Sequence, residues 1–271
     1  MEFQRTGHAD KPAHIDWLRT WFVTRLSQME SSARELWNCE YHRRGIPSSY
    51  RDEPSTVLKW ALNNWPLLAG HSLPTTALDS GCGAGRNARY LADHGVAVVG
   101  LELSDAAITE CRRQRQSQQP PPVFVHCDVT MGLPLRSAHF DMVCDIFVYK
   151  HIVDSEARTT YRREISRVLT RNGRVLLSLA EARDEYYAGC PDIADRSSTT
   201  HGSTRVVLDP VAGVQSVLFS FDALVAEMSD HFVLDMCWHR EQPGLMHGKE
   251  YLRRTMATLW RPRQDGHGPN T

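Results

Sequence analysis

The sequence lacks the features of several protein classes. No run of about 18 apolar residues occurs in its 271 residues, so no membrane-spanning helix is expected. Lysine and arginine (31) balance aspartate and glutamate (32), which leaves a net charge of −1 and no general attraction for nucleic acid. The first residues, Met1-Glu-Phe-Gln-Arg5, contain no apolar signal core. We therefore expect a cytoplasmic protein with no membrane or nucleic-acid partner.

Paired cysteine motifs are also missing. The seven cysteines are scattered without any C-x-x-C pair, which predicts reduced and mostly structural thiols. The run His126-Cys127-Asp128 contains three metal-ligating residue types. Consecutive strand residues alternate faces, so these three side chains cannot all bind one ion. No metal site is predicted.

What is present is an alternation of apolar strands and helices. The first strand is expected to begin at Thr76. Four more are expected over 96–101, 123–128, 140–147 and 174–179. Such βαβ repeats predict a parallel, doubly wound sheet. Two more strands, 231–238 and 250–260, are joined by about ten residues and predict an antiparallel pair at the edge. The predicted fold class is α/β, a Rossmann-like, mostly parallel seven-stranded sheet with an antiparallel edge strand.

The predicted domain organisation has three parts. Residues 1–70 form an N-terminal helical cap region, which includes an amphipathic helix over 15–36 that packs on the core or on a partner, or borders the site as a lid. Residues 71–262 form the main domain. Because the periodic pattern lapses after the fifth strand, we expect an insertion over the site at about 182–214. Residues 263–271 are expected to be a disordered tail.

The stretch Asp79-Ser-Gly-Cys-Gly-Ala-Gly85 follows the first strand and precedes a helix. Its glycines are spaced G-x-G-x-G, whereas the dinucleotide fingerprint is G-x-G-x-x-G, so Arg86 stands where the third glycine would be. No Gly-Lys-Ser/Thr follows, which excludes a P-loop. An acid at Asp79 would repel a pyrophosphate but suits an ammonium and a sulfonium. Glu102 closes the second strand, where an acid can bind a ribose diol.

This D-x-G-x-G-x-G arrangement resembles the first motif of class I S-adenosylmethionine-dependent methyltransferases. The resemblance covers about residues 75–180 and includes Asp128-Val129 at the adenine position. Within that class, Gly85-Arg86-Asn87 and Leu245-Met-His-Gly248 look like the tellurite-resistance and thiopurine methyltransferase branch. The helix near 15–40 and the insertion at 182–214 depart from that branch, so its substrate does not carry over.

The resemblance implies a set of cofactor residues for S-adenosyl-L-methionine. Asp79 would hold the ammonium, Glu102 the ribose and Asp128 the adenine amine. Two alternatives stay open, since Asp128 can also cap a helix and Asp145 can be an ordinary strand-end acid. Tyr41 and Tyr50 either close over the cofactor or pack in their loop. The expected cofactor-binding residues are Tyr41, Tyr50, Asp79, Gly81, Cys82, Gly83, Asn87, Glu102, Leu103, Asp128, Val129 and Asp145.

Residues after the fourth strand and in the flanking loops are the candidates for catalysis. His151 could be a general base or could cap the next helix, and Tyr149 and His247 are the other catalytic candidates. The expected substrate-binding residues are Arg51, Tyr149, Lys150, Tyr186, Tyr187 and Arg254, with Arg253 as the alternative to Arg254.

The sequence therefore predicts methyl transfer to an O, N or S nucleophile of a small, specialised metabolite by a monomer or homodimer. The Asn-Pro-Pro-Tyr-like tetrapeptide of many base and glutamine methyltransferases is absent, and Asp145-Ile-Phe-Val148 stands in its place. An RNA or protein methyltransferase and a non-catalytic cofactor-binding subunit remain the alternatives. The glycine spacing disfavours an NAD-dependent oxidoreductase.

Overall fold

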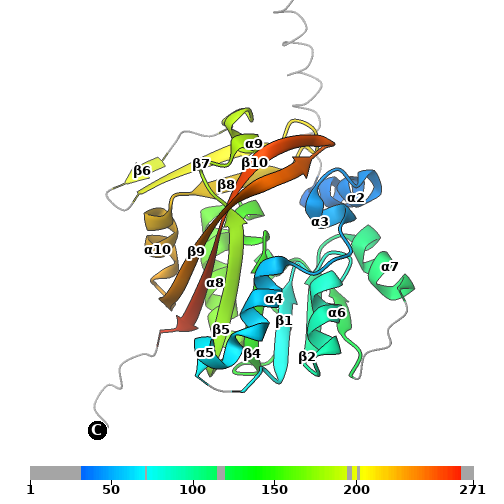
Figure 1. Ribbon diagram of the computed structural model, residues 1–271, viewed down its shortest axis with the longest axis vertical. Coiled ribbons are helices and arrows are strands. Elements are labelled where there is room, and N and C mark those ends of the chain that lie inside the picture. The colour runs from blue at the N-terminus through cyan, green and yellow to red at the C-terminus, as the bar shows by residue number, and fades with distance from the viewer. Residues whose placement is uncertain (1–31, 71, 115–119, 194–196, 200–201, 264–271) are drawn as a thin grey trace, which may run out of the picture.

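The computed structural model of the protein describes residues 32–70, 72–114, 120–193, 197–199 and 202–263 (Figure 1). The helix predicted over 15–36 lies mostly outside these residues, as does the predicted tail. The helices are α2 (Ala33–Arg43), α3 (Pro47–Tyr50), α4 (Thr56–Asn63), α5 (Trp65–Ala69), α6 (Arg86–Asp93), α7 (Asp105–Arg113), α8 (Ser155–Val168), α9 (Glu185–Ala188) and α10 (Phe221–Met228), with short 3-10 turns η1 (Val129–Met131) and η2 (Tyr149–His151). The strands are β1 (Thr76–Ser80), β2 (Ala97–Glu102), β3 (Val123–His126), β4 (Phe140–Ile146), β5 (Leu169–Ala180), β6 (Ser197–Thr199), β7 (Gly202–Leu208), β8 (Gln215–Phe219), β9 (Phe232–Met246) and β10 (Lys249–Pro262).

A seven-stranded sheet with the order β3-β2-β1-β4-β5-β10-β9 forms the centre of the molecule. β1 pairs in parallel with β2 and β4, and β4 pairs in parallel with β5. β10 runs antiparallel to both of its neighbours, β5 and β9. The predicted Rossmann-like, mostly parallel sheet is confirmed. Its reversal of strand order between β1 and β4 creates the crevice in which open α/β sheets bind ligands.

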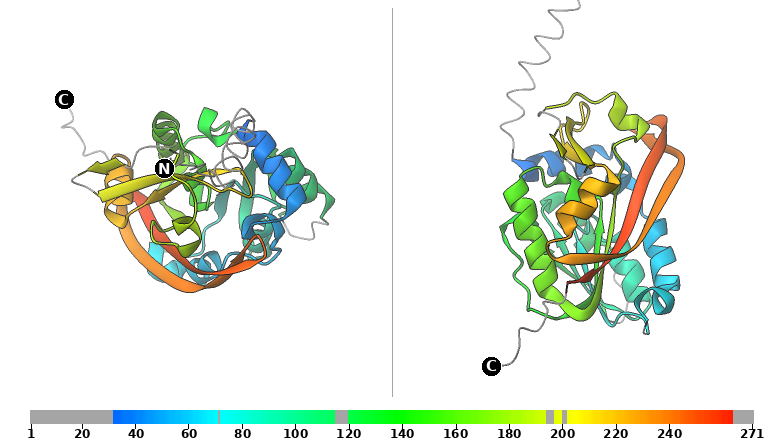
Figure 2. Two further views of the ribbon diagram at one scale, coloured as in Figure 1. Left: turned by 90° about the horizontal axis from the view of Figure 1, so that it is seen from above. Right: turned by 90° about the vertical axis from the view of Figure 1, so that its left-hand side faces the viewer.

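Helices cover both faces of this sheet, as the two views of Figure 2 show. On one face, α4, α5 and α6 pack on alternate strand residues through a buried cluster that includes Leu58, Leu91 and Met142. On the other face, α8 and α10 pack through a second cluster that includes Val143, Ile165 and Leu224. The near-continuous burial of β4 follows from this coverage, because a central parallel strand has no solvent-facing side.

A second, three-stranded sheet of order β6-β7-β8 lies beside the carboxyl ends of the central strands. The sequence predicted an irregular insertion over 182–214, but the described part of this segment contains α9, β6 and β7, and β7 pairs with β8 over five residue pairs. The long β9–β10 hairpin extends past the central sheet and curves over the same end of the molecule (Figure 1). The expected ten-residue connection between the last two strands was wrong, because strand pairing continues up to Met246↔Lys249.

Candidate functional site

The glycine turn between β1 and α6 lies at the carboxyl end of the central strands. Gly81, Gly83 and Gly85 all have positive φ, at 60°, 57° and 82°. Side chains are rarely tolerated in this region, so the turn requires glycine at these positions. At these three positions the turn carries no side chain of its own where the helix begins.

Asp79 lies at the end of β1 directly before this turn. Only 1% of the residue is exposed, and its Oδ2 has no hydrogen-bond partner in the described chain. Burial raises the pKa of this carboxyl to about 7, against an opposing contribution from Arg86. An orphaned carboxylate oxygen in a closed site is unfavourable by itself and is suited to a cationic or amide donor.

Glu102 lies at the end of β2, on the other side of the turn. Its Oε2 accepts a hydrogen bond from the Gly83 N–H at 2.9 Å, and its Oε1 accepts one from the Ser104 N–H at 2.8 Å. Each oxygen retains one lone pair for a further donor. Burial raises the pKa of Glu102, and its backbone donors oppose that shift.

Side chains lie over the turn in this conformation. A Cβ on Gly83 would lie 2.4 Å from the Tyr41 hydroxyl of α2, and a Cβ on Gly81 would lie 2.2 Å from Cγ2 of Val148. Tyr41 is therefore next to the turn, as predicted for a residue that closes over it. Tyr50, at the end of α3, has no described contact with the turn, and it does not line the cavity described below.

Three predicted cofactor residues use their side chains locally. Asn87 accepts from the Ser55 N–H at 2.9 Å and so holds the start of α4. Asp128 caps η1 by accepting from the Thr130 N–H and hydroxyl. Asp145 accepts from two N–H groups of the following turn and from the Tyr161 hydroxyl, and burial raises its pKa to about 6. The helix-cap alternative for Asp128 and the strand-end alternative for Asp145 describe what these side chains do in the structure.

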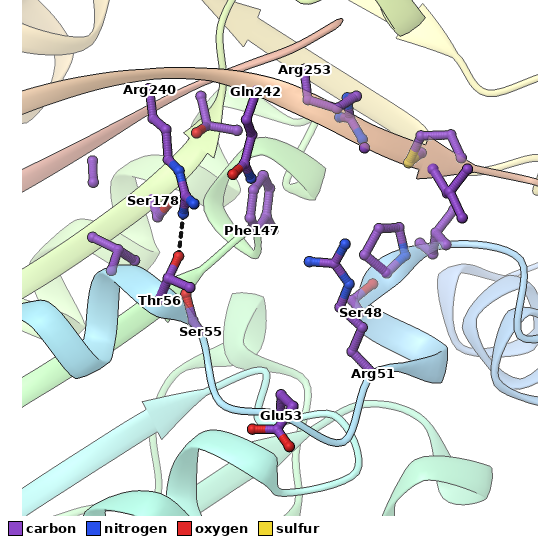
Figure 3. A pocket seen from close by; sticks show the side chains of 18 of the residues that line it. Ser48, Arg51, Glu53, Ser55, Thr56, Phe147, Ser178, Arg240, Gln242 and Arg253 are labelled. Atoms are coloured by element: carbon purple, nitrogen blue, oxygen red, sulfur yellow. Dashed lines mark hydrogen bonds between the residues drawn. The ribbon is translucent and has the colours of Figure 1, made fainter. Parts of the chain in front are cut away.

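A cavity of about 950 Å³ opens beside the turn, at the carboxyl ends of β4 and β5. Its floor includes Phe147 and Ser178, one wall is the loop from Arg51 to Thr56, and the roof is the β9–β10 hairpin (Figure 3). Arg86, the first residue of α6, lines it and connects it to the glycine turn. The cavity thus adjoins the turn at the topological switch point of the sheet.

Phe147 is strained at the floor of the cavity. Its φ is 70°, a value that is a real outlier for a bulky residue. Its N–H donates to the Ser178 carbonyl at 2.8 Å, which ties the end of β4 to β5. Backbone strain of this kind persists where the surroundings hold it, and such positions cluster at functional sites.

Lys150 follows on η2 and lines the same cavity. The residue is 2% exposed, and its Nζ donates to the Tyr187 hydroxyl and, at 3.2 Å, to the Ser216 hydroxyl. No carboxylate among the described residues pairs with it. Burial, with a smaller effect of the nearby Arg253 charge, lowers the pKa of Lys150 to about 7. Lys150 and Tyr187 were both predicted as substrate residues, and both line the cavity.

His151 also lines the cavity, but its ring is held in place. Nδ1 lies 2.7 Å from the Gln215 carbonyl, so this nitrogen carries the proton. The Trp37 and His151 rings pack edge to face, with their centroids 4.8 Å apart. Burial, followed by the Lys150 charge, lowers the pKa of His151 to about 3. Such an imidazole is a weak base near neutral pH.

Other predicted residues lie outside the cavity lining. The Tyr149 hydroxyl bonds to Glu227 and Arg162 in the core between α8 and α10, so its assignment to catalysis and substrate binding is corrected. His247 is in the β9–β10 turn, and its Nε2 lies 3.0 Å from Oδ2 of the buried Asp209. This contact holds the ring in the packing between the turn and Asp209. Tyr186 packs edge to face with Tyr187 and Tyr251 behind the cavity wall.

The structure places the two alternative arginines, Arg253 and Arg254, on opposite faces of the hairpin. Arg254 pairs with Glu241 on the other face of the hairpin, while Arg253 lines the cavity and pairs with the buried Asp184 at 2.9 Å. Sequence reasoning also missed Arg240, Gln242 and Ser178. No local motif marks them, because they reach the cavity only through strand alternation in β5 and β9.

Among the described residues, no group of three or more His, Cys, Asp or Glu side chains could hold a metal ion. No described helix is long and apolar enough to cross a membrane. The strand order, the glycine turn and the strand-end acids define a Rossmann-like α/β protein.

Comparison with known proteins narrows this class. Residues 78–177 match a family described as a methyltransferase domain. An uncharacterized methyltransferase of Schizosaccharomyces pombe is 33% identical over 111 residues, which cover 41% of this chain and 75% of that relative. A malonyl-[acyl-carrier protein] O-methyltransferase of Pseudescherichia vulneris is 41% identical over 73 residues, 27% of each chain. A tRNA (carboxymethyluridine(34)-5-O)-methyltransferase of Xenopus tropicalis is 27% identical over 200 residues, which cover 72% of this chain and 30% of that relative.

Solved structures show the same fold. One concerns the conversion of a disulfide bond into a thioacetal group during echinomycin biosynthesis; its TM-score is 0.62, with 20% identity over 85% of this chain and 92% of that chain. The 1,6-didemethyltoxoflavin-N1-methyltransferase of Burkholderia thailandensis, with S-adenosylhomocysteine and 1,6-didemethyltoxoflavin bound, has a TM-score of 0.56 and 19% identity over 96% and 94% of the two chains. The chain belongs to the methyltransferase family.

Proposed function

We propose that this enzyme methylates a small molecule bound in the cavity between the glycine turn and the β9–β10 hairpin. The observation that carries the proposal is the cavity itself. Its volume of about 950 Å³ falls within the roughly 300–1,000 Å³ of small-molecule sites, and the hairpin covers it. A folded RNA or protein substrate would need an open surface instead.

The residues around the turn fit S-adenosylmethionine. The unpaired Oδ2 of Asp79 would accept from the cofactor's ammonium end, and the free lone pairs of Glu102 would accept from the ribose hydroxyls. When bound, the cofactor supplies a methyl group on a sulfonium, which reacts by in-line displacement. The chain contributes alignment and exclusion of water, and Tyr41 would close the turn.

We assign the base to Lys150 and not to His151. A neutral Lys150 amine that donates two hydrogens to Tyr187 and Ser216 keeps its lone pair for a proton. Nζ would take the O–H or N–H proton of the acceptor, which makes the acceptor atom the stronger nucleophile. The His151 ring is a much weaker base because its pKa is about 3.

The proposal has two further parts: the acceptor is a specialised metabolite, and the enzyme is most like the tellurite-resistance and thiopurine methyltransferase branch. Gly85-Arg86-Asn87 and the elaborated roof of the cavity support them. Among similar proteins, the B. thailandensis enzyme binds a small acceptor, whereas the X. tropicalis relative is named for tRNA. A cytoplasmic monomer or homodimer stays a prediction.

Methyl transfer to a mixed pool of acceptors tests the proposal. The enzyme would be incubated with tritiated S-adenosylmethionine, a deproteinised metabolite extract, total RNA and total protein, and then ultrafiltered. We expect enzyme-dependent tritium in acceptor molecules of the filtrate. Tritium retained with RNA or protein would contradict a small-molecule acceptor. Cofactor binding without transfer to any pool would favour the non-catalytic subunit.

A further inference from the structure

The charge of the cavity lining differs from that of the whole chain. The chain as a whole has a net charge of −1. The cavity is lined by Arg51, Lys59, Arg86, Lys150, Arg240 and Arg253 against Asp52, Glu53 and Asp209. The charge of Arg253 is neutralised by the buried Asp184, and Asp209 accepts hydrogen bonds from two backbone N–H groups. The remaining lining is cationic.

Among the described residues, only Arg253 of the cavity's lysines and arginines has a carboxylate partner, and two of the others, Arg51 and Arg240, enter the cavity from opposite walls. Arg240 donates only to the Thr56 hydroxyl, a neutral group. Arg51 extends from the loop after α3, on the wall opposite to β9 (Figure 3). Figure 3 shows the Arg240 side chain hanging from the roof and Arg51 reaching up from below, while Glu53 lies lower on the loop. Two uncompensated guanidinium groups thus enter one cavity from facing walls.

Gln242 and two tryptophans complete the surroundings. Gln242 is two residues after Arg240 on the same face of β9, so it also points into the cavity (Figure 3). Trp60 and Trp238 line the cavity and pack edge to face, with centroids 4.7 Å apart. This end of the cavity offers an aromatic surface beside guanidinium and amide donors, which suits an aromatic body with an anionic oxygen group.

We infer that the methyl acceptor carries an anionic oxygen group, a carboxylate or phosphate, that binds between Arg51 and Arg240. This inference rests on the proposed small-molecule function and names the chemical class of its substrate. Guanidinium groups match the two oxygens of such an anion with paired N–H donors. The anion binds near the mouth, and Lys150 remains beside the reacting atom on the floor.

Equilibrium binding of aromatic probes tests the subsite without requiring turnover. Benzoate, phenyl phosphate and the neutral isostere benzamide would be titrated by calorimetry into the full chain saturated with S-adenosylhomocysteine. We expect an anionic probe to bind at least about tenfold more tightly than benzamide, and Arg240→Gln to remove that preference. The better of the two anions identifies the group.

Variants separate the subsite from general charge and from the cofactor. Arg240→Lys, which keeps the charge but loses the paired donors, should retain part of the preference. Arg136→Gln removes an exposed arginine outside the cavity and should change nothing. Arg51→Gln should weaken the anionic probe while leaving the affinity for S-adenosylhomocysteine unchanged; the reverse pattern would assign Arg51 to the cofactor and overturn the subsite.

The anion subsite would also be overturned if benzoate, phenyl phosphate and benzamide bound equally to the wild-type enzyme, or if neither anion bound. An intact, arginine-dependent preference with tritium only in RNA or protein would instead leave the subsite standing and remove the small-molecule function.

Discussion

At the scale of single residues, the site consists of buried charges whose usual partners are missing. Asp79 has an orphaned oxygen, and the hydrogen-bond partners of Lys150 among the described residues are two hydroxyls. Each is costly in the folded chain without a ligand, because burial disfavours the charged form. Such groups are explained more readily by ligand binding than by a contribution to stability. Replacing one should therefore stabilise the unliganded chain and weaken its binding of the ligand.

Replacing Asp79 by Asn should stabilise the unliganded enzyme and weaken cofactor binding. The folded pKa of about 7 lies above the unfolded value of 3.8, so the wild-type chain loses stability as pH rises between these values. Relative to wild type, D79N should therefore gain about 1.4 kcal/mol for each pH unit across that window. Its affinity for S-adenosylhomocysteine should fall at least about tenfold.

Urea unfolding at several pH values and calorimetry of S-adenosylhomocysteine binding would measure the two effects. A loss of stability together with unchanged affinity would show that Asp79 has a structural role.

Lys150 should show the opposite pH dependence. Its folded pKa of about 7 lies below the unfolded value of 10.5, so wild-type stability rises with pH between these values. Lys150→Met lacks this titration. The free energy of unfolding of the wild type should therefore increase relative to that of the variant by about 1.4 kcal/mol per pH unit in that window. With an O or N acceptor, the wild-type rate of methyl transfer should rise with pH around a midpoint near 7. K150M should lose this rise in its pH–rate profile.

Urea unfolding from about pH 7 to pH 10 and pH–rate profiles would check this. Lys249→Met, which removes an exposed lysine from the hairpin, is the control for the loss of one charge. A pH–rate profile that survives in K150M and disappears in His151→Ala would return the base to His151.

At the scale of elements, α2 is the part that encloses the glycine turn. Asn38 on α2 accepts from the Ser104 hydroxyl at 2.8 Å and from the Ala106 N–H at 3.2 Å, so it docks α2 on the start of α7. This docking places Tyr41 beside Gly83. Arg34 also reaches α7, but its partner Asp105 and Arg34 itself are about half exposed.

Asn38→Ala should release α2 from this position. We expect a loss of about 1–2 kcal/mol in the free energy of unfolding and faster amide exchange over residues 33–50. The matched control is Arg34→Gln, which should cost less than about 1 kcal/mol because its ion pair is exposed to solvent. Hydrogen exchange with mass spectrometry would distinguish the two variants, and equal exchange in both would refute the docking role of Asn38.

Elements built from strong periodicity were predictable, and those governed by tertiary context were not. The central strands and α10 follow from apolar patterns that match the structure closely. β9 was predicted to end at Trp238, but it continues to Met246 through Gln242-Pro243-Gly244, a sequence that is typical of a turn. β9 is an edge strand, where a proline does not cost a ladder hydrogen bond, so pairing continues through Pro243↔Leu252.

The same distinction applies to the site. The position of Asp79 and Glu102 beside the turn was predictable, because both lie at the ends of buried strands near glycines. His247 and Tyr149 were misassigned because only the folded chain shows that Asp209 and Glu227 occupy them. The choice between Arg254 and Arg253 could not be made from the sequence, because a one-residue register in β10 decides which side chain faces the cavity.

At the scale of the whole molecule, ligand binding should be visible as global stability. A ligand at one hundred times its dissociation constant adds about 2.7 kcal/mol to the free energy of unfolding. With an unfolding entropy of about 2.1 cal/mol/K per residue, this raises Tm by about 5 °C for a chain of 271 residues.

Scanning calorimetry with S-adenosylhomocysteine should show this rise, and NAD at the same concentration should not. Asp79→Asn should show a smaller rise at the same ligand concentration. A rise with NAD alone would contradict cofactor recognition at the glycine turn.

The position of β10 in the sheet affects how the chain folds during translation. β10 follows every other described strand along the chain, yet it occupies an interior place between β5 and β9. While the ribosome is still producing it, β5 presents an unpaired edge and the hairpin roof does not exist. Nascent chains should therefore depend on chaperones at this stage, and a premature stop before Lys249 should yield aggregating protein and not a weakened enzyme.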